Sequence, residues 1–249
     1  YTQAYATYGS DYDRALNTDA AHQNLRIYKT TAGTFGGNVN VATGVPYAVD
    51  LTIKSGQFGT NGNAFTDGIY VGGLSGGSNK AVRKATVEGG QIFNLIGGPS
   101  VDPNRKAYTL IYTTVKGGEV DFVFGGAGES ATQGHRALNI AGGTINGAAF
   151  GGSNAKTGTS GDGTLQGNTI VYVGGNAVVG GTIRFKKTST DVMYNEHPSS
   201  VFGAGNGNTS NNTIGTVYSS AVVIDGNAHV KGSVFGGGNY GGVGTTLED

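Results

Sequence analysis

The strongest constraint on the fold of this chain is a short phrase that returns along most of its length. Each copy reads as a few β-forming residues, a glycine pair, a strand-like run, an apolar residue and a second glycine pair. The clearest copies are TVEGGQIFNLIGG (Thr86–Gly98), TVKGGEVDFVFGG (Thr114–Gly126), NIAGGTINGAAFGG (Asn139–Gly152) and VIDGNAHVKGSVFGGGN (Val223–Asn239). The apolar residues before the second pair are Val71, Ile96, Phe124, Phe150, Phe202 and Phe235, spaced 25, 28, 26, 52 and 33 residues apart. Such self-similarity predicts a repeat architecture, in which neighbouring units bury one another's apolar faces.

The period and content of the phrase indicate which repeat architecture to expect. Units of 25 to 33 residues with strand-like alternation fit one turn of a parallel β-helix, whereas propeller blades need roughly 40 residues or more. The interval of 52 residues is read as one long repeat that carries an insertion at about 182–199. We therefore predict an all-β, single-domain parallel β-helix (β-solenoid) of about six or seven irregular coils with long loops.

The glycine content supports this prediction. The chain has 48 Gly and only 4 Pro among 249 residues, and the irregular glycine pairs exclude collagen, while a hydrophobic content of 37% excludes simple disorder. Glycine permits the positive φ angles or the close backbone approach that a corner between two sheets requires. Asn154, Asn206 and Asn239 each follow a phenylalanine by four residues and are predicted to form a structural ladder at the turns.

Stacked coils would place equivalent side chains about 4.8 Å apart, like upon like. One predicted interior column contains Ile96, Phe124, Phe150, Phe202 and Phe235, extended by Val71. A second column contains Val87, Val115, Ile140, Val173 and Ile224. Phe124 follows its first glycine pair by six residues but Phe150 follows by seven, so a β-bulge is expected to absorb the difference.

The ends and the loops have their own expected roles. Residues 1–24 do not follow the phrase and are predicted to form an N-terminal cap or leader, with the β-solenoid domain over residues 25–249. Polar excursions at 99–106, 127–136, 153–167, 182–199 and 207–219 are expected to gather on one face, where binding often occurs. Open sheet edges at the ends of the solenoid would allow self-association.

The charge balance argues against several classes of partner. Sixteen Lys and Arg balance sixteen Asp and Glu, so we expect no nucleic-acid binding, and no apolar run reaches the roughly 18 residues that membrane insertion needs. The chain has no Cys, and its four His lack metal-ligand spacing, so neither a metal nor a cofactor is expected. Few charges together with abundant Gly, Asn, Ser and Thr favour an extracellular or cell-surface location.

The phrases GGTINGAAFGGSN and HVKGSVFGGGNYGG resemble the glycine-rich β-helical repeats of large bacterial surface and adhesin-like proteins. The resemblance covers about residues 50–244. It implies a right-handed parallel β-helix, export from the cell and a role at the cell surface. It transfers no catalytic residues, because the shared features are corner glycines and asparagines.

Polysaccharide-cleaving enzymes also use β-helices, typically with clustered carboxylates, so such an enzyme would carry acidic residues at equivalent positions of neighbouring repeats. Glu119 and Asp121 share a predicted strand face, but the neighbouring repeats add no carboxylate there, and a calcium site needs several oxygen ligands. Arg105 and His135 lie in excursions that would flank this face. Asp121, Arg105 and His135 are therefore the catalytic candidates if the chain is an enzyme, although we expect that it is not.

The sequence thus predicts a non-enzymatic structural or adhesive module at the cell surface, with loops that contact a glycan or a host or cell-surface protein. The first alternative is a polysaccharide lyase or glycoside hydrolase of the β-helix type. The second alternative is an ice-binding protein, which requires a regular threonine array on a flat β face. The equivalent positions here vary in residue type, so this alternative ranks last.

Overall fold

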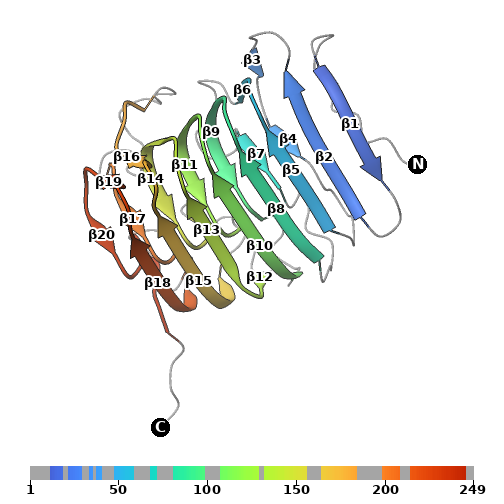
Figure 1. The fold of residues 1–249 in the computed structure, drawn as a ribbon. Helices are drawn as coiled ribbons and strands as arrows, with labels where there is room; N and C mark the ends of the chain where they lie inside the picture. The colour runs from blue at the N-terminus through green and yellow to red at the C-terminus, as the bar shows by residue number, and fades with distance from the viewer. Residues whose placement is uncertain are drawn as a thin grey trace.

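The fold consists of β-strands and their connections throughout the part of the chain that the structure describes. The computed structural model describes residues 12–18, 22–29, 34–35, 38–40, 48–58, 68–71, 81–98, 107–128, 132–155, 164–183, 198–207 and 214–244. No helix occurs among these residues. They form two sheets that face each other, and the chain passes from one sheet to the other repeatedly (Figure 1).

Sheet A contains the first long strand of each repeat. Its nine described strands are β1 (Tyr12–Thr18), β2 (His22–Lys29), β5 (Ala48–Ile53), β8 (Ala81–Val87), β10 (Ala107–Val115), β12 (Thr132–Gln133), β13 (Arg136–Ile140), β15 (Leu165–Val173) and β18 (Val217–Ile224). All of its neighbours pair in parallel except β1 and β2, which are antiparallel. The predicted domain boundary between residues 24 and 25 falls inside β2, which already belongs to the sheet through its pairing with β5.

Sheet B contains the second half of each repeat. Its eleven described strands are β3 (Thr34–Phe35), β4 (Asn38–Asn40), β6 (Gln57–Phe58), β7 (Gly68–Tyr70), β9 (Gln91–Ile96), β11 (Glu119–Phe124), β14 (Thr144–Phe150), β16 (Val178–Val179), β17 (Val201–Phe202), β19 (His229–Val230) and β20 (Val234–Phe235). All of these pairings are parallel. Strands that are single in the middle repeats are split into two short strands in the first and last repeats. The all-β prediction and the parallel stacking are therefore correct for the described residues.

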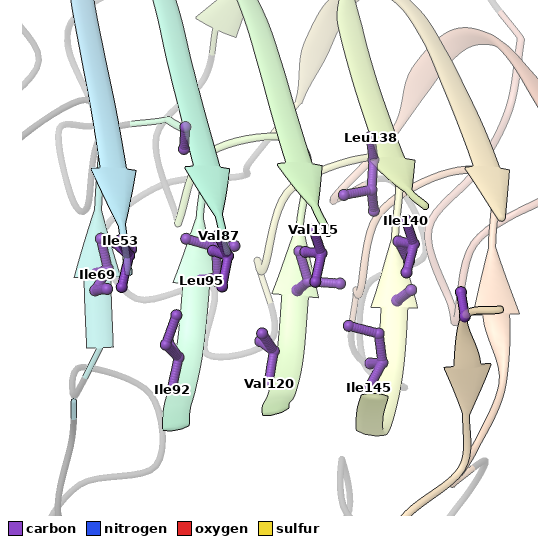
Figure 2. Packing of buried hydrophobic residues seen from close by; sticks show 14 of the residues in the cluster. Ile53, Ile69, Val87, Ile92, Leu95, Val115, Val120, Leu138, Ile140 and Ile145 are labelled. Carbon is purple, nitrogen blue, oxygen red and sulfur yellow. The ribbon is translucent and has the colours of Figure 1, made fainter. Parts of the chain in front are cut away.

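An aliphatic row runs along the inside of sheet A. Its members are register partners in successive strands: Ile53, Val87, Val115, Ile140, Val173 and Ile224. The first five are fully buried, and they pack against Ile69, Ile92, Leu95, Val120 and Ile145 of sheet B (Figure 2). Burial of each such side chain contributes about 1.5–3 kcal/mol, which no isolated repeat could obtain. This inner cluster is the core that joins the two sheets.

An aromatic row runs along sheet B. Phe124, Phe150, Phe202 and Phe235 are register partners whose ring centroids lie 4.9, 4.8 and 4.8 Å apart, with interplanar angles of 6°, 4° and 8°. Ile96 continues the row, and the next partner is Tyr70 rather than the expected Val71. Val71 instead packs in the inner cluster.

The aromatic row does not lie in the inner core, where it was expected. Val123 belongs to the inner cluster, and because side chains alternate along a strand, Phe122 and Phe124 point to the opposite face of sheet B. There they form a second buried cluster with Phe93, Phe150 and Phe202. Sheet B therefore carries an apolar layer on each of its faces.

The two glycine pairs of each repeat serve different purposes. The second glycine of the first pair turns the chain at positive φ, as at Gly118, where φ is 76° and a Cβ would lie 2.7 Å from the backbone carbon of Gly89. The first glycine of the second pair faces sheet A at close range. A Cβ on Gly97 would lie 2.6 Å from Cγ2 of Ile111. One pair thus supplies a corner, and the other lets the sheets converge.

An asparagine ladder lies four residues after the phenylalanines of the aromatic row in three repeats. Nδ2 of Asn206 donates to Oδ1 of Asn154 at 3.0 Å, and Nδ2 of Asn239 donates to Oδ1 of Asn206 at 2.9 Å. All three side chains are buried. Each amide therefore satisfies its neighbour, which a buried polar group requires.

Candidate functional site

The candidate site is an open pocket on sheet B. The pocket has a volume of about 420 Å³ and is lined by Glu119, Thr144, Asn146 and Thr182. Glu119 and Thr144 are register partners at the starts of β11 and β14, and Asn146 follows two residues later on β14. Thr182 comes from the residues after β16 and is exposed. Three consecutive repeats therefore contribute to one site.

A β-bulge shapes this pocket. The register between β11 and β14 shifts between Val120 and Phe122, where β14 contains one additional residue, which confirms the predicted bulge. Gly147 occupies the bulge, and a Cβ at this position would lie 2.7 Å from the carbonyl oxygen of Asp121. Close approach of this kind is what glycine at a bulge provides. The bulge places the Asn146 side chain at the floor of the pocket.

Asp121 does not line the pocket but binds one of the side chains that do. Its side chain is 1% exposed, and its Oδ1 accepts a hydrogen bond of 2.8 Å from Nδ2 of Asn146. A carboxylate acceptor makes this bond stronger than one between neutral groups and fixes the orientation of the amide. The site therefore offers two threonine hydroxyls and one accessible carboxylate, that of Glu119, beside the largely buried Asn146 amide. Such a mixture of donors and acceptors suits a hydroxyl-rich ligand.

Of the three catalytic candidates, the structure describes Asp121 and His135, and it does not bring these two together in the pocket. Asp121 is in sheet B, whereas His135 is an exposed residue just before β13 of sheet A, where its Nδ1 accepts a 3.4 Å hydrogen bond from the backbone N–H of Asn168. His135 does not line the pocket. Arg105 lies outside the described residues. Within those residues, no group of three or more His, Cys, Asp or Glu side chains is arranged to hold a metal ion.

Sequence reasoning missed two buried arginines in sheet A. Arg136 was assigned to a polar excursion, but it begins β13 and is 1% exposed, and its Nη1 and Nη2 donate to the carbonyls of His135 and Gln133 at 3.1 and 3.3 Å. Burial lowers the pKa of Arg136 to about 9 and that of Arg83 to about 10. Alternation with Leu138 and Ile140 was the available signal, because residues two apart share a face.

The outer face of sheet A is regular in backbone but not in residue type. One row of register partners contains Thr52, Thr86, Thr114, Asn139, Tyr172 and Val223. Tyr112 and Ile170 lie in the neighbouring row and are exposed. Three successive threonines in this row are followed by residues of other types, so the regular threonine array that an ice-binding face requires does not continue across the described strands.

Comparison with known proteins gives no relative for this chain. No protein-family model matches it, and neither a curated protein nor a solved structure is similar to it. No helix in the described part of the chain is long and apolar enough to cross a membrane.

Proposed function

We propose that this chain is a right-handed parallel β-helix from an exported protein, and that it serves as a rigid structural or adhesive module at a cell surface. In this proposal the pocket on sheet B and the neighbouring loops contact a glycan or a surface protein. No catalytic step is assigned to the chain.

The observation that carries the proposal is the continuity of the two apolar rows. The aliphatic row connects six strands of sheet A, and stacked aromatic rings connect four strands of sheet B. A structure in which each repeat is fixed by its neighbours is stiff along its length. Rigid rods of this kind suit the display of binding surfaces away from an anchoring point.

The chemistry of the pocket supports contact rather than cleavage. Hydrolysis of a glycosidic bond ordinarily uses two carboxyl groups that flank the bond. Of the two carboxylates near the pocket, Glu119 lines it, while Asp121 is buried and bonded to Asn146. The polar groups that remain accessible are suited to hydrogen bonding with sugar hydroxyls.

The direct test is a glycan array probed with the purified chain and two variants. Asn146→Ala removes a pocket side chain and is expected to abolish or strongly weaken any binding that the wild type shows. Thr114→Ala alters a partly exposed side chain on sheet A and serves as the control, with unchanged binding expected. Binding that survives Asn146→Ala would contradict the pocket assignment.

A parallel screen for cleavage tests the main alternative. The chain is incubated with uronate-containing and neutral polysaccharides, and new chain ends are measured. No release is expected. Reproducible cleavage by the wild type that is lost in Asp121→Asn would overturn the proposal in favour of a polysaccharide lyase or hydrolase.

A further inference from the structure

The largely buried side chain of Asn146 has one orientation. It is 4% exposed, and its Nδ2 donates a hydrogen bond of 2.8 Å to Oδ1 of Asp121. Only the NH2 end of an amide can meet an ionised carboxylate, because the carboxylate only accepts hydrogen bonds. Oδ1 of Asn146 therefore points away from Asp121. This oxygen accepts no hydrogen bond from any described residue, although Asn146 lines the pocket.

A glycine keeps the space in front of this oxygen open. The backbone N–H of Gly181 donates to the backbone carbonyl of Asn146 at 3.2 Å, which holds the two residues together. A Cβ on Gly181 would collide with Oδ1 of Asn146 and would lie 3.0 Å from Cγ2 of Thr144. Because Gly181 has no Cβ, Oδ1 stays in contact with the pocket. A ligand that fills the pocket must then donate a hydrogen bond to Oδ1, since an acceptor that loses water without a new partner weakens binding.

A second acceptor lines the same pocket. Glu119 contributes a carboxylate, which only accepts hydrogen bonds when it is ionised. Register partners on neighbouring strands lie about 4.8 Å apart, and Asn146 follows Thr144 by two residues, so the Cα atoms of Glu119 and Asn146 are about 8 Å apart. Oxygens of both side chains can therefore reach one ligand group. None of the four described lining residues is basic, and the two threonine hydroxyls can donate or accept.

We propose, building on the glycan contact proposed above, that this pocket selects a saccharide with a free primary amine. The ammonium group donates to Oδ1 of Asn146 and to the carboxylate of Glu119, and its third N–H meets a threonine hydroxyl. An ammonium group has three donors and no acceptor, so it satisfies both acceptors at once. A sugar hydroxyl or an acetamido N–H offers one donor and satisfies only one of them. A uronate carboxylate offers none.

The size and lining of the pocket fit a saccharide better than a metal ion. The volume of about 420 Å³ lies in the range of pockets that hold small organic ligands. Calcium takes about six to eight oxygen ligands and is ordinarily held by several carboxylates. Here one described carboxylate lines the pocket, and Oδ1 of Asp121 is bonded to the Asn146 amide. The ring hydroxyls of a sugar can use the remaining threonine groups.

A matched glycan series tests the proposal with the intact chain. Its members are β-1,4-linked tetramers of glucosamine, N-acetylglucosamine, glucose and glucuronate. Titration calorimetry is done at pH 6, where an amine is protonated and a glutamate is ionised. The glucosamine tetramer is expected to bind about tenfold or more tightly than either neutral tetramer, and the glucuronate tetramer most weakly, with no effect of EDTA. A neutral tetramer that binds as tightly as the glucosamine tetramer, or binding that EDTA abolishes, would overturn the proposal.

Glu119→Gln tests the charged contact. It is expected to weaken binding of the glucosamine tetramer about tenfold and that of the glucose tetramer less than twofold, because only the ammonium group loses a charge-assisted bond. Glu88→Gln is the matched control, since Glu88 is exposed, does not line the pocket and removes the same charge from the chain. Equal losses in the two variants would refute a direct contact with Glu119.

Gly181→Ala tests the contact with Oδ1 of Asn146. The added methyl group occupies the space in front of this oxygen and is expected to weaken binding of the glucosamine tetramer about tenfold or more. Gly237→Ala is the control, because a Cβ on Gly237 meets nothing within 4 Å and should leave binding unchanged. Circular dichroism shows that each variant is folded. A Gly181→Ala chain that binds like the wild type would contradict the role of Oδ1.

Amine selection and glycan contact fail in different ways. If the glucosamine and glucose tetramers bind equally and Asn146→Ala abolishes both, the glycan contact at the pocket stands and the selection of an amine is wrong. If no tetramer binds, both the glycan contact and the selection of an amine are wrong.

Discussion

Two parts of sheet B, compared in successive repeats, show what the fold holds constant and what it leaves free. One row of register partners contains Ile92, Val120, Ile145, Val179 and Val230, and a second row contains Leu95, Val123, Ala149, Val201 and Val234. The number of residues between the two rows varies greatly: the two members are three positions apart in the first two repeats, four in the third and last, and 22 in the fourth. The rows are therefore fixed, while the chain between them is free to lengthen. The pocket lies where this lengthening begins, at Asn146.

A one-residue insertion within a row should have the largest effect. Insertion of Ala between Leu138 and Asn139 moves Ile140 to the other face of β13, between two strands that keep their register. We expect loss of the cooperative thermal transition, because the aliphatic row is interrupted at its centre. Circular dichroism during heating measures this, and a variant that melts like the wild type would show that the row does not specify the fold.

Phe150→Ala should destabilise the chain by about 3–5 kcal/mol, because Phe150 stacks on a ring at each side and is almost fully buried. Urea unfolding measures the change in the free energy of unfolding. Tyr112→Ala is the control, since Tyr112 is 43% exposed and its loss should cost about 0.5 kcal/mol or less. Similar losses in the two variants would mean that the aromatic row contributes nothing beyond an exposed side chain.

The aliphatic row of sheet A is the part of the structure that the sequence predicts best. Each repeat carries one member at a nearly constant offset from a glycine, so Val87, Val115 and Ile140 could be aligned without coordinates. The face of sheet B on which the phenylalanines lie could not be predicted. Phe122, Val123 and Phe124 are all apolar, so either Val123 or the two phenylalanines could face the inner core. The choice between Tyr70 and Val71 failed for the same reason. The pocket depends on a β-bulge. The different spacing of Phe124 and Phe150 from their glycine pairs predicted that a bulge exists, but it did not locate the bulge at Asn146 and Gly147.

Arg136 tests whether a buried charged residue on the inner face of sheet A limits the stability of the fold. Because burial lowers the pKa of Arg136 in the folded chain to about 9, well below its ordinary value, the unfolded chain keeps a proton that the folded chain loses as the pH rises through this pKa. The stability of the wild type relative to Arg136→Met should therefore increase from about pH 8 to pH 10.5, at no more than about 1.4 kcal/mol per pH unit. Urea unfolding of both proteins at each pH measures the difference. A difference that is constant or falls with pH would contradict the inward, desolvated position of the guanidinium.

Asn206→Ala should cost about 1–3 kcal/mol, because it leaves the buried amides of Asn154 and Asn239 each without one hydrogen bond. Asn176→Ala is the matched control, since Asn176 is exposed and accepts one long bond of 3.4 Å from Asn227. Its effect on the free energy of unfolding should be within about 0.5 kcal/mol. An equal cost for both variants would mean that burial of the ladder does not matter.

The smallest effect is expected where the fold leaves the chain free. In the last repeat, three residues, 231–233, connect the two rows of sheet B, and insertion of six Gly and Ser residues between Lys231 and Gly232 would lengthen this connection to nine. Tripling the length of a flexible loop costs about 1 kcal/mol in closure entropy, and both rows keep their register partners on β16 and β17. Urea unfolding should show a loss of about this size, far below that of the single Ala inserted in β13. A loss of several kcal/mol would instead mean that the spacing between the rows is itself specified, and that the long insertion before β17 is accommodated by features particular to that repeat.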